Sequence, residues 1–279
     1  MLDKFRKEIV QVLLDTKSEL APLIEKLDME KISKHNKGYL AYSNDPVKYF
    51  IDMEFIRYAK TLDFLFNKSK EQYIKHILDI GFFIPVIPIC LAKLGFAVSS
   101  IEKLSYYDGA LDKIIEYTIK HYRIELIDED LFDFKPKEKR YYDSILLLAV
   151  IEHLHGSPRF ILNTIKKLLK LEGYLVLDTP NISSLTKRIV FLVKGKPPNP
   201  HFKDYFYSEY PFSGHNREYT LDDVLFALNA TGFNIVKIET FYHSLLKPKS
   251  IKAKLLYYLE KIGPQSWKPY IWTVAQPRI

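Results

Sequence analysis

Short hydrophobic runs alternate with longer amphipathic stretches along most of the chain. The short runs contain many Ile, Leu and Val residues and end at polar residues or glycine, which is typical of strands. Seven such strands are predicted, over residues 77–80, 97–101, 122–127, 143–150, 174–178, 234–241 and 271–275. Helical periodicity fills most of the intervals between them. Strands alternating with helices predict an α/β fold with a doubly wound, mostly parallel, seven-stranded sheet.

A helical segment is expected before this sheet. Residues 1–28 carry an amphipathic pattern that Pro22 interrupts, which predicts one kinked helix or two short ones. Residues 29–44 are expected to form a loop, and Asp45-Pro46 is expected to begin a helix that ends near Phe66. We therefore divide the chain into an N-terminal helical cap or lid, residues 1–70, and an α/β domain, residues 71–279. The segment is either a packing cover or a lid that screens a ligand from water.

The stretch from Tyr73 to Lys103 has the organisation of a nucleoside-binding βαβ unit. A strand ends at Gly81, an apolar helix follows, and the second strand ends at Glu102. The stretch departs from this pattern at residues 82–85, where the sequence is Phe-Phe-Ile-Pro instead of a glycine-rich loop. Binding is retained if the proline occupies the first helical turn and a phenylalanine lines the pocket. A fold that no longer binds a nucleoside is the alternative.

A glycine and several polar residues follow the carboxyl ends of four predicted strands. They are Gly81, Glu102, Asp130 and the pair Glu152-His153. In a parallel sheet with right-handed crossovers these positions meet at one edge, where ligands bind. The sequence therefore predicts a single ligand site built from four loops.

The last third of the chain contains two additions. Residues 181–215 form a long connection rich in Lys, Pro and aromatic residues, which we interpret as an insertion on the acceptor side of the site. Residues 243–270, before the last strand, form a basic and amphipathic segment. This segment would suit a peripheral contact with a membrane surface, and an ordinary surface helix is the alternative.

Composition narrows the functional classes. The chain has 279 residues, 47% of them hydrophobic, and can bury a substantial core. Its single cysteine excludes an intramolecular disulfide, and the absence of a signal-peptide pattern leads us to expect a cytoplasmic protein. The longest apolar run, about thirteen residues, is too short to span a bilayer.

The net charge of +7 permits an anionic partner, but the sequence has no dedicated RNA-binding module and we expect no nucleic-acid partner. The acidic residues 128–130 lack the spaced partners of a divalent site, so no metal is expected.

Six motifs in order resemble the class I S-adenosylmethionine-dependent methyltransferases of the type-11/type-12 kind, over roughly residues 73–243. They are ILDIG (77–81), SSIEK (99–103), EDLFDF (129–134), YYDSILLLAVIEHLHGSP (141–158), LLKLEGYLVLDTPN (168–181) and GHNREYTLDDV (214–224). The resemblance implies a Rossmann-like fold and S-adenosyl-L-methionine as cofactor.

The resemblance also implies roles for single residues. Gly81 would allow the backbone to approach the amino-acid part of the cofactor, and Asp79 would contact the ammonium group. Glu102 would accept hydrogen bonds from both ribose hydroxyls. Asp130 would accept one from the adenine amino group, with Leu131 packed on the ring. Glu152 is placed with these cofactor-binding residues.

Methyl transfer from a sulfonium is an in-line displacement that depends on alignment, and a hydroxyl acceptor gains from a base near neutral pH. The candidate bases are His153 and His215, with His155 as a third. We therefore expect O-methylation of a sugar, a lipid-linked saccharide or another small metabolite. The alternatives are a catalytically silent methyltransferase-like scaffold and an RNA methyltransferase.

Overall fold

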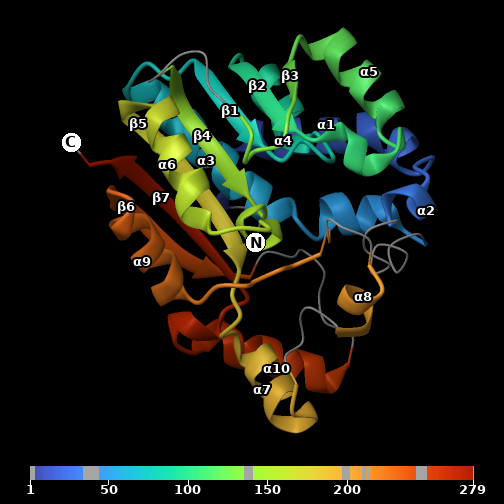
Figure 1. Ribbon diagram of the computed structural model, residues 1–279, viewed down its shortest axis with the longest axis vertical. Coiled ribbons are helices and arrows are strands. Elements are labelled where there is room, and N and C mark those ends of the chain that lie inside the picture. Colours follow the sequence, from blue (N-terminus) through green and yellow to red (C-terminus); the bar gives the residue numbers. More distant parts are fainter. Residues whose placement is uncertain are drawn as a thin grey trace.

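The computed structural model describes residues 4–33, 44–134, 141–196, 202–208, 212, 214–242 and 250–278. These residues contain a seven-stranded sheet in the order β3-β2-β1-β4-β5-β7-β6 (Figure 1). The strands are β1 His76–Ile80, β2 Ala97–Glu102, β3 Glu125–Asp128, β4 Tyr142–Leu148, β5 Leu169–Pro180, β6 Phe233–Phe241 and β7 Tyr270–Pro277. All pairs are parallel except those of β7, which runs antiparallel to β5 and β6. The predicted doubly wound, mostly parallel sheet is confirmed.

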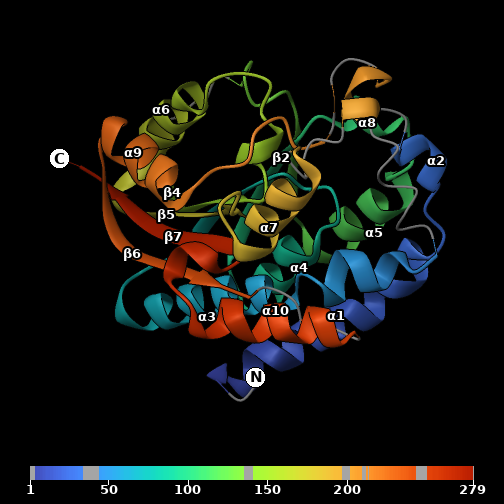
Figure 2. The same cartoon turned by 90° about the horizontal axis from the view of Figure 1, so that it is seen from below.

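Helices cover both faces of the sheet (Figures 1 and 2). One face carries α3 Phe55–Glu71, α4 Val86–Lys93 and α5 Asp112–Tyr122, with α1 Lys7–Ile24 packed against all three. The other face carries α6 Pro158–Leu168 and α9 Leu221–Ala230. Shorter elements are α2 Met29–Ile32, a π-helical turn Lys48–Asp52, α8 Phe202–Phe206 and the 3₁₀ turns η4 Leu104–Tyr107, η5 Ile151–His153 and η6 Gln265–Trp267. The predicted N-terminal helical segment is confirmed.

The two cores follow from strand alternation. In β1, Ile77 packs with the α3 and α4 side, whereas Leu78 and Ile80 pack with the α6 side. The central strand β4 is buried on both faces, as its continuous apolar run requires. Local signals fix the ends of the α6-side helices. The Ser157 hydroxyl accepts the Arg159 amide at the start of α6, and a capping box joins Thr220 and Asp223 at the start of α9.

Several predicted boundaries in the N-terminal segment are wrong. Of the two alternatives for residues 1–28, the structure has a single helix, because Pro22 lies in the last turn of α1, where little of the helix remains to be disrupted. The expected loop 29–44 begins with α2, whose N-terminus is capped by the Asp28 side chain. The helix expected from residue 45 is instead a π-helical turn followed by α3.

Two corrections concern the second half of the chain. β5 begins at Leu169 and not at Tyr174, because an irregular register extends its pairing with β4 back to Tyr142. The described residues of the connection 181–215 include two helices, α7 Leu185–Lys194 and α8. In the basic segment, residues 243–249 lie outside the described residues, and α10 Ile251–Ile262 follows them. Helices α7 and α10 lie beyond the carboxyl ends of the parallel strands, nearest the viewer in Figure 2.

Candidate active site

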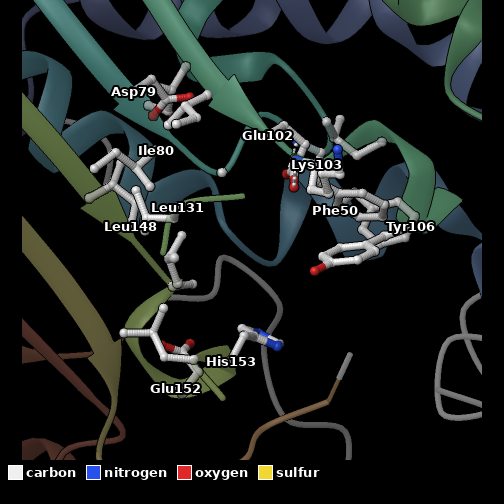
Figure 3. A pocket seen from close by; sticks show the side chains of 18 of the residues that line it. Phe50, Asp79, Ile80, Glu102, Lys103, Tyr106, Leu131, Leu148, Glu152 and His153 are labelled. Atoms are coloured by element: carbon white, nitrogen blue, oxygen red, sulfur yellow. Dashed lines mark hydrogen bonds between the residues drawn. The ribbon is translucent and has the colours of Figure 1, made fainter. Parts of the chain in front are cut away.

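A cavity of about 400 Å³ lies at the carboxyl ends of β1, β2 and β4, within the usual size range of small-molecule sites. Strand order reverses between β1 and β4, so this is the crevice that the topology leaves open. The cavity brings together every site residue named from the sequence: Asp79, Gly81, Glu102, Asp130, Leu131, Glu152, His153 and His215. Figure 3 shows two groups of carboxyls in it, Asp79 and Glu102 in one region and Glu152 beside His153 in another.

The loop that departs from the glycine-rich pattern does not fill this cavity. Phe82 turns away and is completely buried in the protein interior. Phe83 forms a wall of the cavity, with its ring stacked on Tyr107 at a centroid separation of 5.3 Å and edge-on to Phe50 at 5.2 Å. Pro85 immediately precedes α4, so its missing amide breaks no helical hydrogen bond. The bulky residues are therefore compatible with a ligand.

Gly81 occupies a position that only glycine fits. Its φ angle is +96°, and a Cβ atom there would lie 2.7 Å from Cγ2 of Val150. The glycine thus keeps the turn after β1 close to the turn after β4, with the cavity beside both.

Two acidic side chains, those of Asp79 and Glu102, lie at the carboxyl ends of β1 and β2. The Glu102 carboxylate accepts the backbone amides of Phe83, at 3.3 Å, and Lys103, at 3.0 Å, which fixes its orientation. Burial raises the pKa of Glu102. Burial, and then the charge of Glu102, raise the pKa of Asp79 to about 8, although Arg57 acts in the opposite direction. The pair is therefore short of positive charge, as a site for a cationic ligand would be.

Asp130 is held at the end of β3 by two hydrogen bonds. It accepts the Tyr106 hydroxyl at 2.7 Å and the Phe132 amide at 2.8 Å. Leu131 packs beside it, partly buried, against the α6-side core. The side chain at the position expected for an adenine-binding acid is thus held in one orientation in the lining of the cavity.

Glu152, His153 and His215 form a cluster of donor atoms. One donor atom from each lies within 4.8 Å of the other two. The Glu152 side chain is fully buried, and its Oε2 accepts the Thr179 hydroxyl at 3.0 Å. Burial raises the pKa of this carboxyl. The sequence places Glu152 with the cofactor-binding residues and expects no metal ligands. The structure adds that this carboxyl lies beside the two histidines, because η5 turns the chain directly after β4.

The two imidazole rings are oriented by hydrogen bonds at Nδ1. His153 Nδ1 lies 3.1 Å from the carbonyl oxygen of Gly214, and His215 Nδ1 lies 2.8 Å from Oε1 of Glu218. Their rings are nearly perpendicular, with centroids 4.9 Å apart. Burial opposes a charge on His215, but its hydrogen bond to Glu218 and the nearby carboxyl groups outweigh burial and raise its pKa. By contrast, His155 is exposed on the rim.

Arg57 is a site residue that the sequence reasoning missed. This buried side chain of α3 lines the cavity, with Nη1 3.1 Å from Oδ1 of Asp178 and Nε 2.8 Å from Oε2 of Glu54. Asp178 lies in β5, and burial raises its pKa to about 7 despite the arginine. The available signal was a single arginine within the apolar run that starts α3. The N-terminal segment therefore contributes directly to the cavity.

Comparison with known proteins places this geometry in context. A family model described as a methyltransferase domain matches residues 55–238, which is more than half of the chain. A ubiquinone biosynthesis O-methyltransferase of Rickettsia bellii is 31% identical over 125 residues, which are 43% of this chain and 50% of that protein. The chain thus spans about half the length of the curated relatives that it matches first.

Two solved structures share the fold. One is the magnesium protoporphyrin IX methyltransferase of Synechocystis with bound S-adenosylhomocysteine, at a TM-score of 0.54 and 13% identity, covering 88% of this chain and 96% of that one. The other is the 1,6-didemethyltoxoflavin-N1-methyltransferase of Burkholderia thailandensis, at a TM-score of 0.52 and 12% identity, covering 94% and 90%. At these identities the likeness concerns the fold.

Proposed function

Because this chain belongs to the class I S-adenosylmethionine-dependent methyltransferases, we propose that it transfers a methyl group from S-adenosylmethionine to a hydroxyl oxygen of a small metabolite. The observation that carries this proposal is a single cavity with two chemically different groups of residues. One contains acids at the ends of β1, β2 and β3. The other contains the histidines after β4 and before α9.

We assign the acidic group to the cofactor. Asp79 would contact the ammonium, Glu102 the ribose hydroxyls and Asp130 the adenine amino group, with Leu131 against the ring. Two features support the assignment. The Glu102 and Asp130 carboxylates are held in place by hydrogen bonds to the protein, and Gly81 keeps the backbone beside them free of a side chain. A cationic cofactor would offset the high pKa that burial gives Asp79.

We assign the histidine end to the acceptor. A hydroxyl oxygen attacks the methyl group as its proton leaves, and imidazole side chains oriented toward the acceptor are suited to promote that loss. The curated relatives are O-methyltransferases, which favours oxygen as the attacked atom. Aromatic side chains line the cavity and would pack against a sugar or other ring: Tyr49, Phe50, Phe83, Tyr106, Tyr107, Phe132, Phe212 and Tyr270. A sugar, a lipid-linked saccharide or another small ring-bearing metabolite fits this lining.

The charge of the cavity argues against an RNA substrate. Its described lining carries six carboxyl side chains against one arginine and one lysine, in Glu54, Asp79, Glu102, Glu129, Asp130 and Glu152 against Arg57 and Lys103. A phosphate backbone approaching the methyl donor would meet unfavourable charge. A silent scaffold would have no need of a histidine pair held in fixed orientation, so the pair favours an enzyme.

The function is tested by measuring binding and turnover separately. Calorimetric titration with S-adenosylmethionine gives cofactor affinity, and transfer of a labelled methyl group to a panel of sugars and phenols gives activity. We expect His153→Gln and His215→Gln to keep cofactor affinity and to lower turnover about 100-fold or more. Transfer to nitrogen acceptors but to no hydroxyl compound in the panel would refute the O-methylation proposal.

We also propose a peripheral contact with a membrane through α7 and α10, on the side where an amphiphilic acceptor would arrive. The two helices are joined by Glu260, which accepts the amide and hydroxyl of Thr186. Their exposed apolar side chains are Phe191, Leu192, Val193, Ile251, Leu255, Tyr258 and Ile262, and their basic side chains include Lys194, Lys252, Lys254 and Lys261. No helix in the described part of the chain is long and apolar enough to cross a bilayer. We expect the exposed face of α7 and α10 to rest on the surface of a membrane, with its apolar side chains among the lipids.

Cosedimentation with phosphatidylglycerol vesicles tests this contact. We expect Leu192→Ser with Ile251→Ser to reduce the bound fraction, because both side chains are largely exposed and would insert among the lipids. The matched control is Phe226→Ser, which removes an exposed aromatic from α9. Equal binding by the double variant and the control would exclude the proposed surface.

A further inference from the structure

We propose that Glu152, His153 and His215 bind one divalent first-row transition metal ion, at the acceptor end of the cavity. The inference rests on the proposed methyltransferase function only for the role of the ion. The site itself is argued from three observations on these residues.

The first observation is convergence. A carboxylate and two imidazoles from separate segments place their donor atoms within 4.8 Å of one another. Two ligands about 2.1 Å from the same ion lie at most about 4.2 Å apart, so small side-chain adjustments would close the site. Two nitrogen donors and one carboxylate oxygen suit Zn²⁺, Fe²⁺ or Co²⁺ better than Mg²⁺, which prefers oxygen ligands alone. The three donors also leave coordination positions for a substrate.

The second observation is the orientation of both rings. A carbonyl oxygen can only accept, so the contact between His153 and Gly214 puts the proton on Nδ1 of a neutral His153 and the lone pair on Nε2. His215 donates in the same way to the Glu218 carboxylate. The Glu218 side chain is buried and forms an ion pair with Lys187. A histidine that ligates a metal usually donates its other ring N–H to a carbonyl or a carboxylate, and both histidines show that arrangement.

The third observation is a buried carboxylate oxygen of Glu152 that has no hydrogen-bond partner among the described residues. Glu152 is completely buried, and its Oε2 accepts the Thr179 hydroxyl. Its Oε1 is also buried but has no hydrogen-bond partner among the described residues. A buried carboxylate oxygen without a partner is costly, and a metal ion bound beside both histidines would satisfy it. The three observations are of different kinds (donor convergence, ring orientation and an unsatisfied oxygen), and all concern the cluster of Glu152, His153 and His215.

The bound ion would activate the acceptor. A hydroxyl coordinated to a divalent cation loses its proton more readily, as metal-bound water does. The proton leaves to solvent, the oxygen forms a bond to the methyl carbon, and the carbon–sulfur bond breaks. The products are a methyl ether and S-adenosylhomocysteine. In this arrangement the histidines hold the ion and do not act as the base themselves.

Metal binding is measured first, without any methyl acceptor. The full chain is treated with a chelator, dialysed and titrated with ZnCl₂ in a calorimeter, and the zinc content after gel filtration is measured by mass spectrometry. We expect one ion per chain. Glu152→Gln and His215→Gln should each weaken zinc binding roughly 100-fold or more, because each removes a ligand. Glu218→Gln should weaken it about 10-fold, since it only orients His215.

The control variant is His121→Gln. The Nδ1 of this histidine also lies near a carbonyl, that of Tyr117, but the residue is exposed on α5. It should retain the wild-type stoichiometry. Less than about 0.1 ion per wild-type chain, or equal zinc binding by the folded ligand variants, would overturn the site. Melting curves establish which variants fold. If a ligand variant does not fold, the zinc content of the wild-type chain and the affinity of Glu218→Gln still decide the test.

A parallel titration with S-adenosylmethionine separates this proposal from the general function. Chelated enzyme that binds the cofactor and still methylates hydroxyl acceptors at the wild-type rate would refute the metal and leave the methyltransferase intact. Zinc bound at one ion per chain by a protein that transfers no methyl group would confirm the site and refute the function.

Discussion

Replacement of Asp79 by Asn should increase the stability of the cofactor-free protein near neutral pH. The carboxyl is buried, and its pKa is raised from 3.8 to about 8. A group whose pKa is higher in the folded state contributes stability at low pH, and loses that contribution as the pH rises through the folded value. Between pH 3.8 and pH 7 each pH unit amounts to about 1.4 kcal/mol, which gives about 4 kcal/mol at pH 7. Asn carries no such penalty.

The pH dependence is the decisive part of this prediction, because Asn also changes local packing by an amount that does not vary with pH. At pH 4.5 the penalty on Asp79 is only about 1 kcal/mol. The difference in unfolding free energy between the variant and the wild type should therefore fall by about 3 kcal/mol between pH 7 and pH 4.5. Urea denaturation at the two pH values measures it. Asp15→Asn, which removes an exposed carboxylate from α1, is the control and should show no comparable change.

The same variant should bind S-adenosylmethionine more weakly, by roughly 10- to 100-fold, since the ammonium group loses a charged hydrogen-bond partner. Stability gained and affinity lost in one variant would identify Asp79 as a residue kept for binding. A stability difference that is the same at both pH values would refute the reasoning, as would unchanged cofactor affinity.

Three further substitutions test other parts of the site. Glu102→Gln should weaken S-adenosylmethionine binding roughly 10- to 100-fold in calorimetry, because the ribose hydroxyls lose a charged acceptor; unchanged affinity would contradict the assignment. Gly81→Ala should lower stability by about 1–3 kcal/mol in urea denaturation, because its Cβ would lie 2.7 Å from Val150 Cγ2 at a φ of +96°; an unaltered midpoint would show that the turn can relax. Arg57→Leu should cost about 3–5 kcal/mol by leaving Asp178 buried without its partner, and Asp178→Asn added to it should restore much of that stability. An additive loss in the double variant would exclude the pairing as the cause.

Strand positions were the most predictable part of this molecule. A strand buried on both faces needs a continuous apolar run, so β1 and β4 are readable directly, and the residues that follow them lie at the carboxyl edge. This is why Glu102 and the pair after β4 could be placed in one cavity from the sequence. The start of β5 was less readable, because its first residues pair through an irregular register that no local pattern encodes.

Contacts between segments that are distant in the sequence could not be predicted from the sequence. Arg57 lies in a helix that precedes the sheet, and only the packing of α3 against β5 reveals that it enters the cavity. Local sequence also did not decide which phenylalanine after Gly81 would line the site. That depends on the left-handed turn at Gly81, which sends Phe82 inward and leaves Phe83 at the cavity. The cluster of Glu152 with two histidines needed the three-dimensional fold for the same reason.

The charge of the cavity lining affects how strongly the methyl donor and its product would bind. The formal net charge of the chain is +7. The described lining of the cavity nevertheless has six carboxyl side chains and only one arginine and one lysine, Arg57 and Lys103. A concave site of one sign concentrates ligands of the opposite sign, and S-adenosylmethionine brings a sulfonium and an ammonium. Methyl transfer converts the sulfonium to a neutral thioether, so the product loses part of this attraction while the substrate keeps it. The product should therefore bind more weakly than the substrate as far as charge is concerned. Under the proposed assignment, the carboxyl groups of Asp79 and Glu102, whose ionisation burial makes costly in the empty protein, would be stabilised as carboxylates by the cationic donor more than by its product.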